Sequence, residues 1–533
     1  MSGEPDRRLD LDPSGVRGGL EAFEQDTGDR PPFYLSKTEI KLLAISGVGF
    51  FLDAYDLFII NQVTVMLQFV LYDGKALPAG LHGLVNASAN IGSVIGQFGF
   101  GYLADALGRK AIYGKELMII IFATILSMAA PTGPLLRAGH PNSVLVWLFV
   151  WRIVLGIGVG ADYPLSASVS SDRVSVRKRG VILAYVFANQ ASYVHNIGWG
   201  SLIGSLVTMI TIAAYKHVIN DEGKVSRADG IWRIIVGLSL IPAFATLYFR
   251  LTLPESKRYI KARQRVEGID SEESTMDETL KKDDSSSEKH SNRPATHVMV
   301  EKKQHVLEFI SYFSEWRHLK ILIGTCSCWF FLDIAFYGIN LNQSSVLQQI
   351  GFGGKGNAWH VMWETALGNL VITALGFVPG YYVTVLTVEY LGRKWIQMQG
   401  FLLQGLFLAI LAGTFGHIST AGFVVNFALL QFFFNFGANA TTFLYPAEVF
   451  PTRFRASAHG MSAACGKAGA IIASLGFNAL SMHIGTNNVL WIFFGCSMIG
   501  AVCTLLLPEV KGRDADEIDA QELREAHARN RVQ

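Results

Sequence analysis

The chain alternates between long apolar runs and short polar connections. Twelve runs are apolar over about 20 residues, the length that a helix needs to cross the hydrocarbon core of a bilayer. The predicted helices lie at 40–70, 81–105, 111–130, 144–169, 180–213, 231–252, 319–348, 358–388, 395–416, 420–444, 456–482 and 486–507. The pattern therefore predicts an all-α membrane protein with 12 transmembrane helices.

A polar segment separates the first six runs from the last six. Its middle, 267–303, is rich in Ser, Asp, Glu and Lys, a composition that does not form a packed core. We therefore expect two six-helix bundles and no cleaved signal peptide before the first run. The expected segments are a cytoplasmic tail at 1–38, bundles at 39–253 and 319–508, a partly disordered cytoplasmic linker at 254–318, and a cytoplasmic tail at 509–533.

Basic residues give the expected orientation. They cluster in the connections at 109–110, 177–179, 393–394 and 453–455, which all fall on one side of the predicted membrane. Cytoplasmic loops carry an excess of Lys and Arg, so we expect this side and both termini in the cytoplasm.

Composition agrees with a membrane protein and argues against other classes. Half of the 533 residues are apolar, and the mean hydropathy is +0.31, which is too apolar for an ordinary soluble domain. The net charge of +2 gives no argument for nucleic-acid binding. The sequence has no evident metal-ligand spacing or nucleophile–base set, so we expect neither an enzyme nor a bound metal or other cofactor. Gly156, Gly158 and Gly160 lie within an apolar run, where they favour close helix packing over a nucleotide-binding loop.

Two short motifs recur in the two halves. The segment GYLADALGRK at 101–110 is echoed by EYLGRK at 389–394, and PESK at 254–257 is echoed by PEVK at 508–511. A duplicated bundle with its site near the midplane, between the halves, is a common transporter plan. The first motif supplies charged residues at helix ends, which we interpret as contacts of a cytoplasmic gate and not as substrate ligands: Asp105, Arg109, Glu389 and Arg393.

Asp333 is the most informative polar residue within the apolar runs. Trp329 and Tyr337 lie four residues before and after it, so the three share one helix face. A carboxylate costs several kcal/mol or more at the centre of a bilayer and is usually kept for handling ions or substrate. At about 1.5 Å rise per residue, Gln190 and Lys467 lie at similar depth in other runs. Polar groups from several helices are thus expected to converge near the middle of the membrane.

Asp53 and Asp56 in the first run are spaced by three and share a helix face, so they can share one proton. With Arg152 and Asp162 of the fourth run they could form a proton route. Those two residues lie about 15 Å apart along one helix, so we expect Arg152 to meet one of the two carboxylates of the first run instead. The alternative is a static salt-bridge cluster that braces the first and fourth runs, and Glu116 could belong to either arrangement.

Several motifs resemble those of the major facilitator superfamily. They are the segment 101–110, the glycine-rich run at 152–160, and YPAEVFPTRFR at 445–455. A narrower pattern, GADYPLSA at 160–167 followed by RG at 179–180, resembles the signature of fungal and plant proton-coupled inorganic phosphate symporters. Ala161 stands where that family usually has Gly. The resemblance implies a major facilitator fold, and import of inorganic phosphate with protons by alternating access across the plasma membrane, without a cofactor.

The resemblance also implies roles for single residues. The positions that match the substrate site of these symporters are Tyr163, Gln190, Trp329, Asp333, Tyr337 and Asn439. In the same symporters, the positions that match Asp162 and Lys467 are implicated in transport. The chemistry agrees, because the indole, hydroxyl and amide groups can donate hydrogen bonds to phosphate while Lys467 supplies positive charge. A protonated Asp333 would donate as well, so that proton binding and anion binding favour each other.

Other interpretations of these residues stay open. Asp333 could form a passive ion pair with Lys467. Its two aromatic neighbours could serve helix packing, and the two amides could join helices without touching substrate.

Competing functions also stay open. A carrier of an organic phosphate, such as a glycerophosphodiester, is the nearest, although that sister family generally has Glu at the position of Asp162. A sugar–proton symporter is disfavoured, because such sites are rich in Gln and Asn and rarely hold a Lys–Asp pair between the halves. A phosphate-sensing transceptor with little flux is a further alternative. The expected partners are inorganic phosphate, protons and the lipid bilayer.

Overall fold

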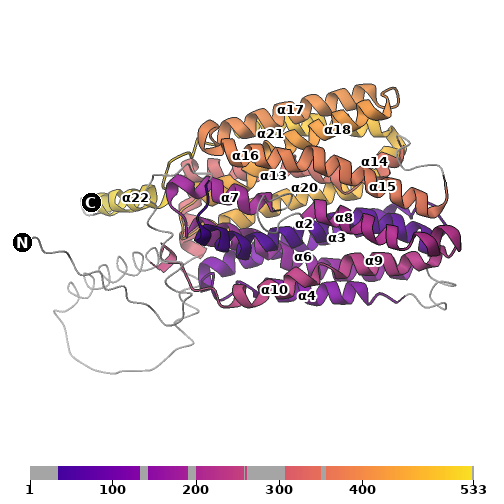
Figure 1. The fold of residues 1–533 in the computed structure, drawn as a ribbon. Helices are drawn as coiled ribbons and strands as arrows, with labels where there is room; N and C mark the ends of the chain where they lie inside the picture. Colours follow the sequence, from indigo (N-terminus) through magenta and orange to yellow (C-terminus); the bar gives the residue numbers. More distant parts are fainter. Residues whose placement is uncertain are drawn as a thin grey trace, which may run out of the picture.

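The computed structural model describes residues 34–131, 142–189, 200–256, 258–260, 306–349 and 356–530. Within these ranges the regular structure is helical, and the long helices run side by side in one bundle (Figure 1). The expected N-terminal tail up to residue 33, the middle of the expected linker at 261–305, and Gln190 lie outside the described residues.

Each of the 12 predicted runs coincides with one or two observed helices. The first half contains α2 (Lys37–Tyr72), α3 (Ala79–Leu107), α4 (Lys115–Met128), α6 (Asn142–Ser171), α7 (Arg179–Ala188), α8 (Gly200–Ala214), α9 (Ala228–Gly237) and α10 (Leu240–Leu251). The second half contains α13 (Trp316–Asn340), α14 (Gln343–Gln349), α15 (Ala358–Ile372), α16 (Val378–Leu391), α17 (Arg393–Thr414), α18 (Thr420–Asn435), α19 (Ala438–Val449), α20 (Arg455–Ile484) and α21 (Thr486–Thr504). A further helix, α22 (Ala515–Asn530), lies in the segment that was expected to be only a tail.

Nine helical segments of the described chain are long and apolar enough to cross a membrane. Three of them are joined pairs, α9–α10, α15–α16 and α18–α19. The other three predicted spans are α3, which is rich in Gly, Ala and Ser, α4, which has 14 residues, and the pair α7–α8, between which residues 190–199 are not described. All lie within the same bundle (Figure 1).

The structure breaks or shortens some of the predicted helices. The span predicted at 319–348 divides into α13 and α14, and the Asn342 amide donates a hydrogen bond to the main-chain oxygen of Gly338 at 2.9 Å. This bond satisfies a carbonyl at the end of α13 and stabilises the break. The span predicted at 111–130 begins only with α4, because Gly114 has a φ of 94° and therefore cannot continue a right-handed helix.

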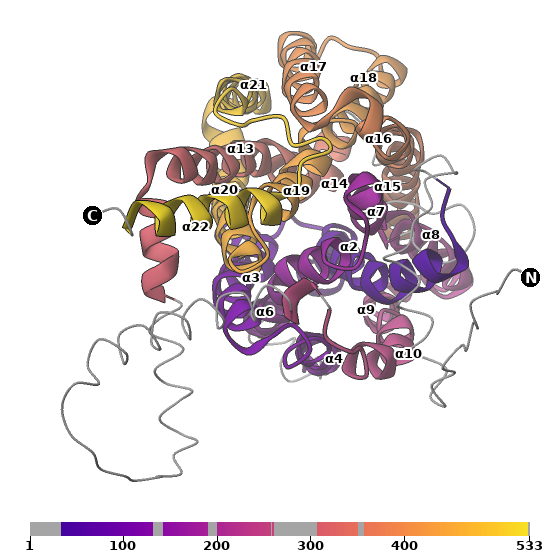
Figure 2. The same cartoon turned by 90° about the vertical axis from the view of Figure 1, so that its left-hand side faces the viewer.

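The two halves form separate groups when the bundle is viewed from its end (Figure 2). They meet where α3 packs along α20 and α7 packs against α16. A Cβ on Gly101 of α3 would lie 2.7 Å from the main-chain oxygen of Ala456, so this glycine allows the halves to approach closely. Within the first half, Gly156 and Gly160 face the backbone of α3 and Gly158 faces α4. The prediction that these three glycines serve close helix packing is confirmed.

Candidate substrate and proton site

A lysine–carboxylate pair lies where α13 meets α20. Lys467 Nζ is 3.7 Å from Asp333 Oδ2 and donates a hydrogen bond to the Tyr337 hydroxyl. All three side chains are buried. Trp329 lies against Gly466, where a Cβ would be 2.9 Å from the indole Nε1, so the glycine makes room for the ring. The structure thus brings together four residues that the sequence predicted for the site.

Aromatic rings from both halves of the chain enclose this lysine. Lys467 Nζ lies 5.0 Å from the ring centroid of Tyr163 and 4.0 Å from that of Tyr337, within range of cation–π attraction. The ring centroids of Tyr163 and Trp329 are 6.3 Å apart. Phe58 of α2 stacks on Tyr337 at 5.9 Å and 14°. The cation therefore sits between the halves, as a transporter site requires.

Asn439 reaches the site through a second tyrosine. Its amide nitrogen donates to the Tyr381 hydroxyl at 2.7 Å and to Asn435 Oδ1 at 2.8 Å. Tyr381 of α16 in turn lies within electrostatic range of Tyr163 and Asp333. These contacts favour the interhelical role that the sequence left open for Asn439. Sequence reasoning missed Tyr381, which stands in an apolar run with no charged neighbour to mark it.

Asp162 pairs with Arg250, which the sequence analysis did not select. Arg250 Nη1 lies 2.8 Å from Asp162 Oδ1, and Nη2 lies 3.3 Å from Oδ2. The same Nη1 is 3.0 Å from Glu116 Oε1, and Asp162 also accepts a hydrogen bond from Ser166 at 2.7 Å. Arg250 stands at the end of a predicted span, where basic residues usually serve as anchors. One feature of the sequence could have revealed Arg250: the arginine lies inside the apolar run, whereas an anchoring residue would follow the run.

Asp53 and Asp56 are both buried on α2. Neither carboxylate oxygen of Asp53 has a hydrogen-bond partner among the described residues. Asp53 lies within electrostatic range of both Asp162 and Lys467. Arg152 donates to the main-chain oxygen of Asp56 at 3.0 Å. The expected meeting of Arg152 with the first span therefore occurs through the backbone, and no ion pair within 4 Å joins it to either carboxylate in the described chain.

Charged residues join the halves at the end of the bundle where α3 ends and α20 begins. Arg109 lies 3.1 Å from Asp105 and donates to the main-chain oxygen of Thr452 in the second half at 2.8 Å. Asp172 lies 3.7 Å from Arg109 and accepts a hydrogen bond from Arg455. The sequence analysis did not select Asp172, which directly follows α6.

A second charged cluster lies where the start of α7 approaches the end of α16 and the start of α17. Arg393 donates to Glu389 at 2.9 Å and to Glu448 at 2.7 Å. A Cβ on Gly180 of α7 would lie 2.6 Å from Arg393 Cζ. We call the two charged clusters together the inner closure. The four predicted gate residues all belong to it.

Neutral amides join the halves at the opposite end. The Asn61 amide of α2 donates to the main-chain oxygen of Asn340 at 3.2 Å, and the N–H of Ser344 donates to Asn61 Oδ1 at 3.2 Å. Asn369 donates to the Ser344 hydroxyl at 3.0 Å, and Gln431 donates to Asn340 Oδ1 at 2.6 Å. We call this set the outer closure. With both closures formed, the described chain encloses the central lysine from both sides.

Comparisons with known proteins show that this chain is similar to membrane transporters. The family model described as Sugar (and other) transporter matches residues 42–521. A Schizosaccharomyces pombe protein provisionally named an inorganic phosphate transporter is 47% identical, over 95% of this chain and 92% of its own. The inorganic phosphate transporter PHO84 of Saccharomyces cerevisiae is 39% identical, over 90% of this chain and 84% of its own. The repressible high-affinity phosphate permease of Neurospora crassa is 34% identical, over 92% and 88% respectively.

Solved structures show the same fold. The major facilitator proton:xylose symporter XylE, bound to 6-bromo-6-deoxy-D-glucose, has a TM-score of 0.67 at 19% identity, covering 92% of this chain and 100% of XylE. XylE from E. coli in its inward-open conformation has a TM-score of 0.60 at 18% identity, covering 91% and 99%. The predicted major facilitator fold is confirmed.

Proposed function

Because the chain belongs to the sugar (and other) transporter family, we propose that it imports inorganic phosphate together with protons by alternating access. The observation that carries this proposal is the buried pair of Lys467 and Asp333 at the junction of the two halves, faced by hydroxyl and indole groups. The names of the fungal relatives support phosphate as the substrate.

Phosphate binds at Lys467 in this proposal. The ammonium group has three donor hydrogens, and the structure uses one of them on Tyr337. The hydroxyls of Tyr163 and Tyr337 and the indole of Trp329 offer further donors around the same point. Aromatic walls keep water out, which strengthens each of these electrostatic contacts.

Asp333 and Asp53 carry protons in this scheme. Asp333 Oδ2 has no hydrogen-bond partner among the described residues, and an ionised carboxylate in such a place is costly. When Asp333 takes up a proton, Lys467 keeps its whole charge for phosphate and the repulsion between carboxylate and anion disappears. Proton binding and phosphate binding therefore favour each other. Asp53 lies within electrostatic range of both Lys467 and Asp162, and we propose that it links the two.

The remaining proton-linked residues belong to the first half. Asp162 and Glu116 share the guanidinium of Arg250. Asp56 lies further along α2, where its main-chain oxygen accepts a hydrogen bond from Arg152 of α6. The inner and outer closures open in turn, and inward movement of protons supplies the energy without a metal or a nucleotide. The basic connections support a cytoplasmic position for the inner closure and for both termini, in the plasma membrane.

Uptake by purified protein in liposomes tests the function. Labelled phosphate uptake is measured with and without an inward proton gradient, in competition with arsenate, a glycerophosphodiester and glucose. We expect uptake that the gradient stimulates and that arsenate alone blocks. Stronger competition by the glycerophosphodiester would make the protein a carrier of organic phosphate. Uptake that ignores the proton gradient would contradict symport, and phosphate binding without uptake would favour a sensor.

A further inference from the structure

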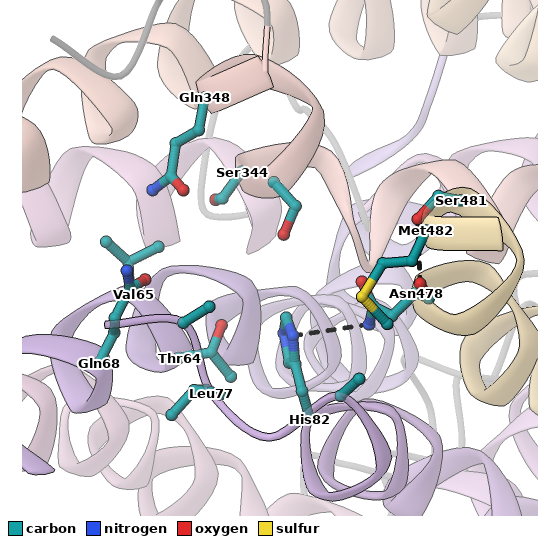
Figure 3. A pocket seen from close by; sticks show the side chains of 13 residues that line it. Thr64, Val65, Gln68, Leu77, His82, Ser344, Gln348, Asn478, Ser481 and Met482 are labelled. Atoms are coloured by element: carbon teal, nitrogen blue, oxygen red, sulfur yellow. Dashed lines mark hydrogen bonds between the residues drawn. The ribbon is translucent and has the colours of Figure 1, made fainter. Parts of the chain in front are cut away.

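A cavity of about 400 Å³ lies between the two halves, at the end of the bundle opposite the inner closure. Its walls come from α2, α3, α14 and α20 (Figure 3). The ends of α3 and α20 that line it are the ends farthest from Asp105 and Arg455, so the cavity lies on the outer side of the proposed membrane orientation. The mechanism proposed above does not use it.

The lining of this outer cavity is neutral and polar. None of the described residues that line it is Asp, Glu, Lys or Arg. Among the groups that can donate hydrogen bonds are the amides of Gln68, Gln348 and Asn478, the hydroxyls of Ser345 and Ser481, and the imidazole of His82. Such a lining does not repel an anion, in contrast to the central site with Asp333. It also lacks the fixed cation that would hold an anion tightly.

His82 contacts Asn478 at the wall of this cavity. Figure 3 shows His82 of α3 facing Asn478 of α20, and the Asn478 amide nitrogen lies 3.5 Å from His82 Nδ1. If the amide donates to Nδ1, the neutral ring carries its proton on Nε2, which is then a donor. Gln348 and Ser344 lie on α14, on the opposite side of the cavity (Figure 3).

This cavity touches the outer closure at one residue. Ser344 lines it, and the same residue donates its N–H to Asn61 and accepts from Asn369. Opening the closure at Ser344 would therefore join the outer cavity to the space around Lys467. A solute bound in the cavity would lie next to the contact that must open before the solute can reach Lys467.

We propose that the outer cavity is an entrance site for a tetrahedral oxyanion such as inorganic phosphate. The anion binds weakly there through neutral donors and moves to Lys467 when the Ser344–Asn61 contact opens. Weak binding is required, because a site on a permeation path must release its solute as readily as it takes it up. The inference rests on the proposed function, since it gives phosphate its first binding place on the way in.

Protection of an introduced thiol tests the entrance site. Ser345→Cys places a thiol in the cavity wall, and the rate of its modification by a neutral, membrane-impermeant thiol reagent is measured in phosphate and in chloride at equal ionic strength. We expect phosphate to slow modification about threefold when its concentration is twice the dissociation constant of the site. Protein that retains Ser345 gives the background from the native cysteines.

A central variant separates the two sites. Protection should persist in Lys467→Gln, and in the double variant Lys467→Gln with Asp333→Asn if the single one does not fold, although both lack the central cation and should lose transport. Protection that disappears with the central site would overturn the proposal, because it would then report only a conformational change. Absence of protection in the intact carrier would overturn it too. Uptake by Ser345→Cys alone checks the proposed function separately.

Paired substitutions identify the donors. His82→Ala combined with Asn478→Ala should abolish protection and raise the KM for phosphate while kcat stays near its original value. His360→Ala, which changes a half-exposed histidine of α15 that does not line the cavity, is the matched control and should keep protection. Full protection in the double variant would show that these donors do not form the site.

Discussion

Arg250 joins four helices of the first half. It lies on α10, pairs with Asp162 of α6 and Glu116 of α4, and donates to the main-chain oxygens of Ile45 and Ser46 of α2, each at 3.2 Å. A planar guanidinium has five donors in a fixed geometry and can serve these acceptors together. A lysine ammonium would keep the positive charge but could not donate hydrogen bonds to all of these acceptors at once.

We predict that Arg250→Lys destabilises the protein by about 1–3 kcal/mol, the cost of leaving buried polar groups without partners. The melting temperature of the purified carrier should fall, and phosphate uptake should fall with it. Arg227→Lys, at an exposed arginine of the same half, is the control and should melt like the original protein. An unchanged melting temperature in Arg250→Lys would mean that the acceptors of Arg250 do not need its geometry.

Asp333 is the residue that couples proton binding to phosphate binding in the proposed scheme. The amide in Asp333→Asn resembles a protonated carboxyl in shape and can donate a hydrogen bond, but it cannot release a proton. We predict that phosphate still binds, while uptake no longer responds to an inward proton gradient. Asp73→Asn is the control, because Asp73 is exposed on an outer connection with a φ of 51°, a conformation that Asn adopts readily. Uptake with unchanged pH dependence in Asp333→Asn would remove this residue from proton coupling.

The sequence was sufficient to predict several residues of the central site, but it was not sufficient to predict which residues pair with each other. Trp329, Asp333 and Tyr337 could be grouped because four-residue spacing fixes their common face. Arg250 could not be assigned to Asp162, because the two are 88 residues apart on separate helices and apolar patterns do not state which faces meet. Tyr381 was missed for the same reason.

The helix α22 is an element that hydropathy did not predict, because its residues are mostly polar. It lies across the end of the bundle that carries the inner closure (Figure 2). Asp516 in its first turn accepts hydrogen bonds from the N–H and the hydroxyl of Thr452, at 2.6 and 2.8 Å. Asp514, just before it, lies 3.8 Å from Arg179 of the first half. The C-terminal segment thus contacts both halves.

Asp516 makes this docking insensitive to pH near neutrality. Burial tends to raise the pKa of its carboxyl, but Arg455 and the hydrogen bonds from Thr452 outweigh burial and hold the pKa below the ordinary value. A group with a lowered pKa contributes stability above its ordinary pKa of about 3.9 and loses it as pH falls through the lowered pKa. The docked state should therefore persist at pH 5.

We predict that Asp516→Asn loosens α22 at neutral pH. Loss of a charged hydrogen bond of about 1.4 kcal/mol would raise amide hydrogen exchange in this helix about tenfold. Glu517→Gln, at the exposed neighbouring position, should exchange like the original protein. If all three proteins exchange alike, Asp516 does not hold the helix.

The apolar runs were predictable from the sequence, whereas the breaks within them were not. Each predicted run contains one or two helices, because about 20 apolar residues in helical form suffice to cross a bilayer. The break between α13 and α14 depends on one amide, Asn342, which finds a carbonyl of its own chain, and the late start of α4 depends on the backbone conformation of Gly114. The periodicity of apolar residues predicts neither the break between α13 and α14 nor the late start of α4.

The whole molecule is closed at both ends by different kinds of bond. Charged pairs form the inner closure, and amide hydrogen bonds form the outer closure. Of the two closures, the inner one includes a close approach of a helix to a guanidinium, where Gly180 of α7 lies against Arg393 at the start of α17. This contact makes the inner closure sensitive to a single methyl group.

We predict that Gly180→Ala weakens the inner closure. The added Cβ would lie 2.6 Å from both Arg393 Cζ and Glu389 Oε1, so the charged cluster must move. Amide exchange in α7 and α16 should rise, and phosphate uptake should fall several-fold because the inner side no longer closes firmly. Gly99→Ala is the matched control, since a Cβ at this position of α3 would meet nothing within 4 Å among the described residues. Equal exchange in the two variants would argue against the contact as part of the closure.

The ribosome makes Glu116 and Asp162 well before their shared partner, because Arg250 follows them by 134 and 88 residues. At a synthesis rate of about 5–20 residues per second, about 7–27 s pass between the synthesis of Glu116 and that of Arg250. During that time two acidic groups lie in helices bound for lipid, where each charge without a partner costs about 3 kcal/mol. The first half therefore completes its assembly only when the sixth span arrives. A chain interrupted before α10 would leave both acids without this partner, so premature termination there should give a protein that the cell cannot insert stably.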